Sequence, residues 1–181
     1  ASLARRRPVR AAPRPKGAAA RALSDAAGAL KDGGAAGIDT ATALATFARL
    51  GVETAPSRLI PGPEEAVDAV LEVGFPAAAK IVSPDADHKT DIGGVVLNIT
   101  TGAELVEACN RIVASFEAHH PGAPHGGILV QGMETGLAEA IVGYRLDALA
   151  GPIVTVGVGG VMAEIYRDFA VRIAPVTLPQ A

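Results

Sequence analysis

The residues that could carry chemistry gather around one apolar segment and the polar loop that follows it. Residues 75–82 read FPAAAKIV, a short apolar run with a single charge at Lys80. Burying a lysine costs free energy unless its ammonium reaches solvent or an anion. Lys80 therefore either extends outward to water or faces an anion such as phosphate, and its position alone does not decide between the two.

The loop at residues 83–94 brings together His88, Lys89 and the pair Gly93 and Gly94. Glycines let the backbone approach an anion closely and donate N–H groups to it, while the lysine and the histidine can offset its charge. The same composition fits a polar hairpin turn with a solvated histidine. The spacing matches neither the dinucleotide-binding glycine fingerprint nor the Walker loop, so phosphate binding and a simple turn both remain open.

Alternating helices and strands are expected to position these residues. Three helices are predicted, each from its capping signal to its last residue or stop signal: Asp39 to Gly51, Pro63 to Gly74, and Thr101 (with Glu104) to Phe116. Their expected apolar faces are Leu44, Phe47, Ala48 and Leu50; Val67, Val70 and Leu71; and Leu105, Ala108, Ile112 and Phe116. Strands are expected at residues 58–60, 75–82 and 95–99.

Beyond residue 127 the pattern changes to consecutive short strands separated by Gly, Asp or Pro, which predicts an antiparallel sheet. The runs are residues 128–131, 138–144, 153–156, 161–166 and 171–173. The expected organisation is a basic linker or tail over residues 1–37, an α/β lobe over 38–126, and the start of a strand-rich second lobe over 127–181.

Charge and composition narrow the class of protein. Residues 1–37 carry eight Lys or Arg against two Asp, whereas the rest of the chain carries eight basic and seventeen acidic residues. A basic arm can bind nucleic acid, but no aromatic residues or motif accompany it, so a linker is favoured. No apolar run is long enough for a membrane span, and no signal peptide is evident. We expect a cytoplasmic chain that contacts no membrane, in which Cys109 is a buried thiol.

Three histidines and one glycine-rich run are less informative. His119, His120 and His125 flank a Pro/Gly loop and lack the helical spacing with a carboxylate that would suggest zinc. The run 157–160, GVGG, joins two predicted strands and does not open a helix, so it is only superficially similar to a phosphate loop.

An ordered series of segments gives the sequence a specific resemblance. Residues 75–95, FPAAAKIVSPDADHKTDIGGV, resemble the signature of the ATP-grasp domain of ADP-forming acyl-CoA synthetases, the NDP-forming acetyl-CoA synthetases related to succinyl-CoA synthetase. Later segments match in the same order: 127–131, 139–143, Asp147, 151–154 and 159–164, followed by Asp168, Arg172 and Pro175. The resemblance covers about residues 39–175.

The resemblance implies an α/β (α+β) ATP-grasp fold with a complete small lobe and the strand-rich beginning of a second lobe. The sequence lacks the acidic-x-Asn-Pro stretch with which the family completes its metal site, so we expect a truncated domain. It also has Gly132 where the family usually has an acidic residue after the glutamine, which predicts weaker adenine or ribose contacts. Ala150 replaces a bulky aromatic before Gly-Pro, a change in packing.

The resemblance also implies a role for each site residue. His88 would be catalytic and carry the phosphoryl group to the nucleotide. Residues implied to bind nucleotide are Lys80, Lys89, Gly93, Gly94, Gln131, Met133, Glu139 and Arg172. Lys80 would contact the phosphates, Gln131 and Met133 would belong to the hinge strand that reads adenine, and Glu139 would face the ribose. Glu164 and Asp168 would reach the metal.

The implied reaction is that of an acid-thiol ligase, in which acid, CoA and ATP give acyl-CoA, ADP and phosphate, reversibly, through phosphohistidine. It requires ATP or ADP and Mg²⁺, with CoA bound by CoA-binding and CoA-ligase domains in cis or in another subunit. The 181-residue chain alone is expected to be inactive. Two alternatives remain: a regulatory or protein-acetyltransferase-associated module without ligase activity, and a nucleic-acid-associated protein that uses the basic arm.

Overall fold

The computed structural model describes residues 17–32, 38–84, 89–160 and 168–177. The chain divides into two compact units, which are treated separately below. The first unit spans Lys16–Glu134, and the second includes Thr135–Ala181. The mixed α/β architecture expected from the sequence is confirmed, with an antiparallel sheet in each unit.

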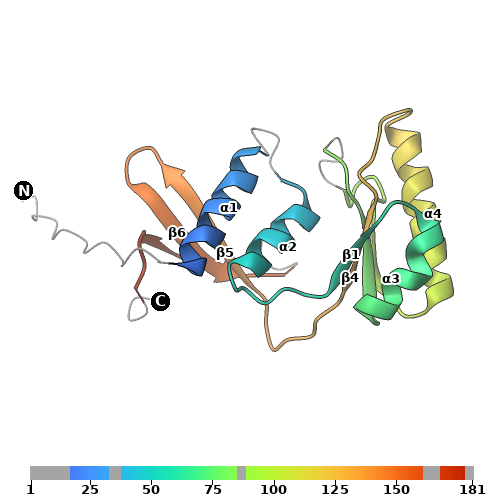
Figure 1. Ribbon diagram of the computed structural model, residues 1–181, viewed down its shortest axis with the longest axis horizontal. Coiled ribbons are helices and arrows are strands. Elements are labelled where there is room, and N and C mark those ends of the chain that lie inside the picture. The colour runs from blue at the N-terminus through green and yellow to red at the C-terminus, as the bar shows by residue number, and fades with distance from the viewer. Residues whose placement is uncertain (1–16, 33–37, 85–88, 161–167, 178–181) are drawn as a thin grey trace, which may run out of the picture. The chain divides into compact units, whose positions relative to one another are not determined.

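The first unit is built on a four-stranded sheet with strand order β1-β4-β2-β3 (Figure 1). Its strands are β1 (Ser57–Ile60), β2 (Ala77–Ile81), β3 (Val95–Ile99) and β4 (Ile128–Gly132). All three pairings are antiparallel. The strand that carries Lys80 is therefore an inner strand, as its apolar sequence predicts.

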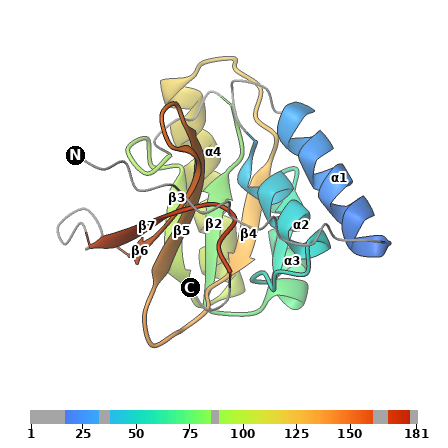
Figure 2. The same ribbon diagram turned by 90° about the vertical axis from the view of Figure 1, so that its left-hand side faces the viewer.

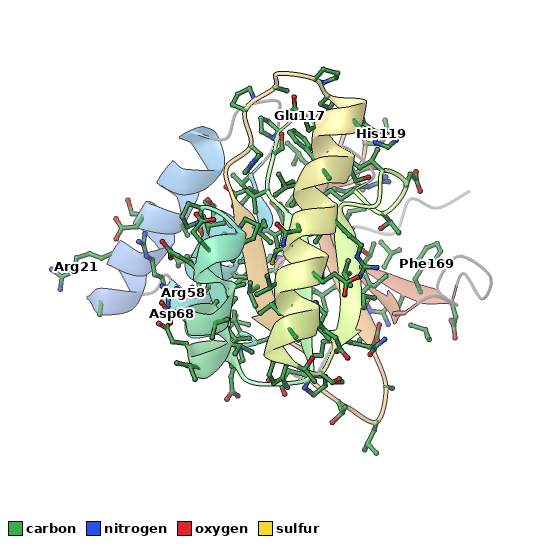
Figure 3. The ribbon with its side chains drawn as sticks, turned by 90° about the vertical axis from the view of Figure 1, so that its right-hand side faces the viewer. Arg21, Arg58, Asp68, Glu117, His119 and Phe169 are labelled. Carbon is green, nitrogen blue, oxygen red and sulfur yellow. The ribbon has the colours of Figure 1, made fainter. Side chains whose placement is uncertain are left out.

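Two helices pack side by side on one face of this sheet, as Figures 1 and 3 show. They are α3 (Ala66–Val73), which follows a 3₁₀ turn η2 (Pro63–Glu65), and α4 (Gly102–His119). The core between helices and sheet combines small side chains such as Ala77, Ala79 and Ala108 with the fully buried Phe116. Small residues let the helices approach the sheet closely.

Two of the predicted helix caps, Asp39 and Thr101, are confirmed, whereas the helix predicted from Pro63 begins with the 3₁₀ turn η2. Asp39 Oδ1 accepts a hydrogen bond from the Thr42 N–H (2.9 Å) at the start of α2 (Thr40–Arg49). At the start of α4, Thr101 Oγ1 accepts from the Glu104 N–H (3.2 Å). The Glu104 carboxylate accepts from the backbone N–H of Thr100 (2.8 Å), one residue before the position expected in a capping box.

Two of the three expected apolar faces differ from the structure. In α3 the buried residues are Ala66, Ala69 and Val73, while Val67 and Leu71 are 53% and 81% exposed. The larger side chains point outward because the small ones allow the closest contact with the sheet. In α2 the buried residue is Thr46, whose hydroxyl donates to the Thr42 carbonyl (2.8 Å), whereas Phe47 and Leu50 are exposed. The face predicted for α4 is confirmed in full.

A helix also occupies part of the segment expected to be a linker. Residues Ala18–Asp32 form α1, whose Ala26 is buried and which packs against α2. Alanine has the highest intrinsic helix propensity, and the prolines of the basic arm all precede this stretch. The basic composition of residues 1–37 therefore led to the prediction of a linker where the structure has an alanine-rich helix.

The second unit contains a three-stranded antiparallel sheet with strand order β5-β6-β7 (Figure 2). The strands are β5 (Ala140–Asp147), β6 (Gly151–Val158) and β7 (Phe169–Ile173). The strand predicted over residues 161–166 lies outside the described residues. β4 belongs by its hydrogen bonds to the first sheet, so the expected lobe boundary at residue 127 differs from the division of the units after Glu134.

Candidate functional site

The face of the first sheet turned away from α3 and α4 carries two polar side chains that sequence analysis placed on strands, Lys80 and Gln131. Directly opposed residues in an antiparallel pair share a face, and the register opposes Lys80 to Leu129 and Ala78 to Gln131. Because alternate residues of a strand also share a face, Lys80 and Gln131 are diagonal neighbours. Their face is opposite to the one that Ala77, Ala79 and Val130 bury in the core.

Lys80 is half-buried, and its ammonium donates a hydrogen bond to Gln131 Oε1 (2.7 Å). Burial lowers the pKa of Lys80 because it disfavours the charged form, and the nearby positive charge of Lys89 lowers that pKa further. The ion pairs among the described residues are formed by Arg58 and Arg145, and none involves Lys80. A half-buried cation whose partner is a neutral amide is a suitable binding point for an anion.

Two backbone hydrogen bonds hold the end of the polar loop, one within the loop and one to β2. The Gly94 N–H donates to the Lys89 carbonyl (2.7 Å), and the Gly94 carbonyl accepts from the Ile81 N–H (2.8 Å). Gly93 has φ of +66°, a conformation that favours glycine. A Cβ on Gly94 would lie 2.9 Å from the Lys89 carbonyl oxygen. Both glycines are therefore required for the path that brings Lys89 to β2, while His88 lies outside the described residues.

A serine on α4 holds the same end of the loop from the other side. Ser115 Oγ donates a hydrogen bond to the Ile92 carbonyl (2.6 Å). The space above Gly93 is filled by this hydroxyl, since a Cβ on Gly93 would lie 3.1 Å from Ser115 Oγ. Sequence analysis did not identify this contact, because a lone serine on an amphipathic helix gives no local signal.

The end of β4 and the residue after it are held by backbone hydrogen bonds to the residues that directly precede β1 and β2. The Gly132 N–H donates to the Pro56 carbonyl (2.8 Å), and the Met133 N–H donates to the Pro76 carbonyl (2.8 Å). The Asn98 N–H contacts Met133 Sδ (3.2 Å). A Cβ on Gly132 would lie 3.2 Å from the Val73 carbonyl oxygen, so a longer side chain there would require a shift of this segment.

A pocket of about 340 Å³ opens on the same side of the sheet, between α2 and strands β1 and β4. Leu59 and Leu129 line it, and both share a sheet face with Lys80 according to the register. Its α2 wall consists of Ala41, Leu44, Ala45 and Ala48. A pocket with mixed polar and apolar lining therefore lies on the same sheet face as Lys80, an arrangement that follows from the strand register.

In the second unit, two acidic residues lie at the end of the sheet where the run 157–160 leaves β6. The Glu139 carbonyl accepts from the Gly159 N–H (2.8 Å), and its Oε2 lies 3.1 Å from where a Cβ on Gly160 would be. The Asp168 carbonyl accepts from the Val158 N–H (3.2 Å). The structure therefore brings Glu139 and Asp168 to the same glycine-rich end, while Glu164 lies outside the described residues.

Arg172 lies on β7 opposite Val154, with its guanidinium exposed. Its Nη1 donates to the carbonyl of the preceding residue, Val171 (3.0 Å). No carboxylate pairs with it among the described residues. The cation is therefore available to an anionic group that approaches this face of the second sheet.

The described residues contain no group of three His, Cys, Asp or Glu side chains that could hold a metal ion. Mg²⁺ commonly uses one or two carboxylates and completes its shell with nucleotide phosphates and water. Glu139 and Asp168 are both exposed. Of the two acids predicted to reach a metal, Asp168 is the described one, and an exposed carboxylate of this kind fits a magnesium ion whose shell is completed by phosphates and water.

The other histidines have packing roles. The ring of His120 stacks on Phe116 (centroids 5.1 Å apart), and His125 packs edge-on against the same ring (5.8 Å). The Gly127 N–H donates to His125 Nδ1 (3.1 Å). His119, near the end of α4 in Figure 3, contacts the Ser115 carbonyl through Nδ1 (2.8 Å). These contacts explain the histidines without a metal.

The first unit is thus an α/β unit that presents a half-buried lysine on the sheet face opposite α3 and α4, beside a loop whose glycines set its path. The family model described as "ATP-grasp domain" matches residues 29–181. The chain belongs to the ATP-grasp family, as the ordered sequence motifs predicted. In the described part of the chain, no helix combines the length and apolar character of a membrane span.

Several curated relatives are ADP-forming ligases. The chain is 39% identical over 141 residues to acetate–CoA ligase [ADP-forming] I of Archaeoglobus fulgidus, covering 78% of this chain and 20% of the relative. It is 40% identical over 118 residues to the beta subunit of acetate–CoA ligase [ADP-forming] I of Pyrococcus furiosus, covering 65% and 51%. The chain thus spans about a fifth of the first relative's length and half of the second's.

Solved structures of similar fold include acetyl-coenzyme A synthetase 1 of Ca. Korarchaeum cryptofilum. A complex of that protein with coenzyme A, Ca-AMPCP and HgCl+ gives a TM-score of 0.77 at 35% identity, covering 86% of this chain and 68% of that one. A second complex contains coenzyme A and Mg-AMPPCP, with a phosphohistidine segment pointing towards the nucleotide-binding site. It gives a TM-score of 0.66 at 31% identity, covering 90% and 67%.

Proposed function

We propose that this chain is the nucleotide-binding part of an ADP-forming acyl-CoA synthetase, an acid-thiol ligase. The whole enzyme would convert an acid, CoA and ATP to acyl-CoA, ADP and phosphate, reversibly. In this proposal the first unit is the small ATP-grasp lobe and the second unit is the beginning of the other lobe. The relatives in which the same region belongs to such ligases support this assignment.

The observation that carries the proposal is the environment of Lys80. Its half-buried ammonium has a neutral hydrogen-bond partner and a second cation, Lys89, close enough to lower its pKa. Two neighbouring cations with a lowered lysine pKa are the arrangement that a polyphosphate stabilises, because the phosphate charge offsets both. We assign Lys80 and Lys89 to the nucleotide phosphates, with Gly93 and Gly94 shaping the loop.

We assign further nucleotide contacts to residues of the second unit. Glu139 would face the ribose, and Arg172 would offset negative charge on the transferring phosphoryl group. Glu164 and Asp168 would hold Mg²⁺ together with the phosphates. The ion would supply charge neutralisation at the phosphate oxygens. Met133, whose backbone and sulfur are both anchored, would lie beside the adenine.

His88 is assigned the phosphoryl transfer. A neutral imidazole is nucleophilic near pH 7, and its phosphoramidate is labile enough to pass the phosphoryl group to ADP. The Korarchaeum enzyme has a phosphohistidine segment that points towards that protein's nucleotide-binding site, which supports a phosphoryl transfer through histidine in enzymes of this kind. CoA would bind outside this chain, in further domains or another subunit. We therefore expect the 181-residue chain alone not to turn over acyl-CoA, and we place the enzyme in the cytoplasm.

The test is an assay of acyl-CoA, ADP and phosphate turnover with the chain joined to its CoA-binding and CoA-ligase domains, in cis or as separate subunits. His88→Ala should abolish turnover and ³²P labelling of this chain. His119→Ala is the matched control, because this histidine is exposed on α4 and should leave both unchanged. Full turnover by His88→Ala would remove His88 from the mechanism.

A further inference from the structure

We propose that Gln131 is a positioning residue for Lys80 and acts on the nucleotide through that ammonium, without contacting adenine itself. The inference rests on the proposed phosphate site and adds to it the group that sets the position and charge of the lysine. Its basis is the 2.7 Å hydrogen bond from Lys80 Nζ to Gln131 Oε1 on the sheet face opposite α3 and α4.

The backbone gives Gln131 a fixed place from which to act. In β4 it is paired with Ser57 of β1 on one side and Ala78 of β2 on the other. β4 therefore has a neighbouring strand on each side, and the segment after it is held at Gly132 and Met133. An acceptor on such a strand restrains the flexible four-carbon side chain of Lys80 to one side of the sheet.

The acceptor is an amide, and its neutrality is the second part of the argument. A carboxylate at this position would form an ion pair with Lys80, favour its charged form and cancel its field at the phosphate. The amide oxygen accepts one of three ammonium N–H donors and adds no charge. Lys80 and Lys89 then present two positive charges to an incoming anion, with the orientation of the first set by Gln131.

Three variants separate this role from direct adenine contact. Gln131→Glu keeps the acceptor and adds charge, and Gln131→Met keeps the shape without the acceptor. Asn110→Asp is the matched control, because it makes the same amide-to-acid change on the exposed side of α4. The 181-residue chain is titrated with tripolyphosphate, ADP and adenosine. The pKa of Lys80 is followed by NMR of ¹³C-methylated lysines.

Gln131→Glu should weaken ADP and tripolyphosphate binding by about tenfold, which is about 1.4 kcal/mol, and should raise the pKa of Lys80. Gln131→Met should weaken both ligands by about threefold (about 0.7 kcal/mol) without raising that pKa. Adenosine affinity should be equal in wild type and all variants, and Asn110→Asp should match wild type throughout.

Four results would overturn the inference. An equal loss of adenosine and ADP affinity in Gln131→Met would show direct adenine contact. A Lys80 pKa that does not rise in Gln131→Glu would show that the two side chains do not interact in solution. If wild type binds tripolyphosphate and Gln131→Glu binds it equally well, the positioning role is rejected and the phosphate site stands. If wild type binds neither tripolyphosphate nor ADP, both the positioning role and the phosphate site are rejected.

Discussion

Replacing Gly94 by alanine should disturb both the stability of the first unit and the proposed site. The added Cβ would lie 2.7 Å from Ile81 Cγ2 and 2.9 Å from the Lys89 carbonyl oxygen. The isoleucine side chain can rotate, but the carbonyl can move only by breaking its 2.7 Å hydrogen bond with the Gly94 N–H. The loop end would therefore separate from β2 and move Lys89.

The expected cost follows from these two effects. Overpacking by one methyl group costs roughly 1–3 kcal/mol, and a lost backbone hydrogen bond costs roughly 0.5–1.5 kcal/mol. We expect Gly94→Ala to lower the free energy of unfolding by about 2–4 kcal/mol. Because Lys89 moves, ADP affinity should also fall under conditions in which the variant is still folded.

Urea unfolding followed by circular dichroism at 222 nm measures this cost. The sequence has no tryptophan, and the described helices all lie in the first unit, so the helical signal reports on that unit. Gly122→Ala is the control: Gly122 has φ of +74° and open space around it, so alanine there carries only the backbone penalty of about 1–2 kcal/mol. If Gly94→Ala were as stable as wild type and bound ADP equally, the close packing described here would be refuted.

Three further predictions concern the core and the α4 cap. Phe116→Ala should lower the free energy of unfolding by about 3–5 kcal/mol, because this fully buried ring fills the core; a loss below about 1 kcal/mol in urea titrations would contradict that role. Burial raises the pKa of the Cys109 thiol to about 11, so its reaction with iodoacetamide at pH 8 should be negligible until urea unfolds the chain. Rapid labelling of the native protein would show an accessible thiolate. The backbone N–H and hydroxyl of Thr100 lower the pKa of Glu104 by binding its charged form. The stabilisation is therefore complete above the ordinary glutamate pKa of 4.5 and is lost as the pH falls through the lower folded-state pKa. Glu104→Gln should destabilise at pH 7 and match wild type in strong acid, and a difference that does not depend on pH would contradict the assignment.

Local patterns in the sequence were sufficient to predict the helix starts. Asp39 and Thr101 cap helices through hydrogen bonds to residues three positions later, so the relevant partners lie within the same short segment. The two strands that flank the polar loop could also be predicted from the sequence, because a glycine-rich turn between two apolar runs favours antiparallel pairing.

Side-chain burial and strand order could not be predicted from local sequence patterns. In α3, Val67 and Leu71 face outward, whereas Ala66, Ala69 and Val73 are buried against the sheet. The hydrogen bond between Lys80 and Gln131 joins residues 51 positions apart and depends on β4 lying next to β2. The helix α1 was missed because its alanines follow a stretch rich in arginine and proline.

The central claim is that the face of the first sheet opposite α3 and α4 binds nucleotide phosphate through Lys80. Calorimetric titration of ADP and Mg·ATP into the 181-residue chain tests it directly, with wild type, Lys80→Met and the exposed-cation control Arg111→Met. A charge-assisted hydrogen bond contributes about 1.5–3 kcal/mol, so Lys80→Met should weaken binding by at least about tenfold. Arg111→Met should bind as wild type does. Equal affinities for wild type and Lys80→Met would contradict the claim.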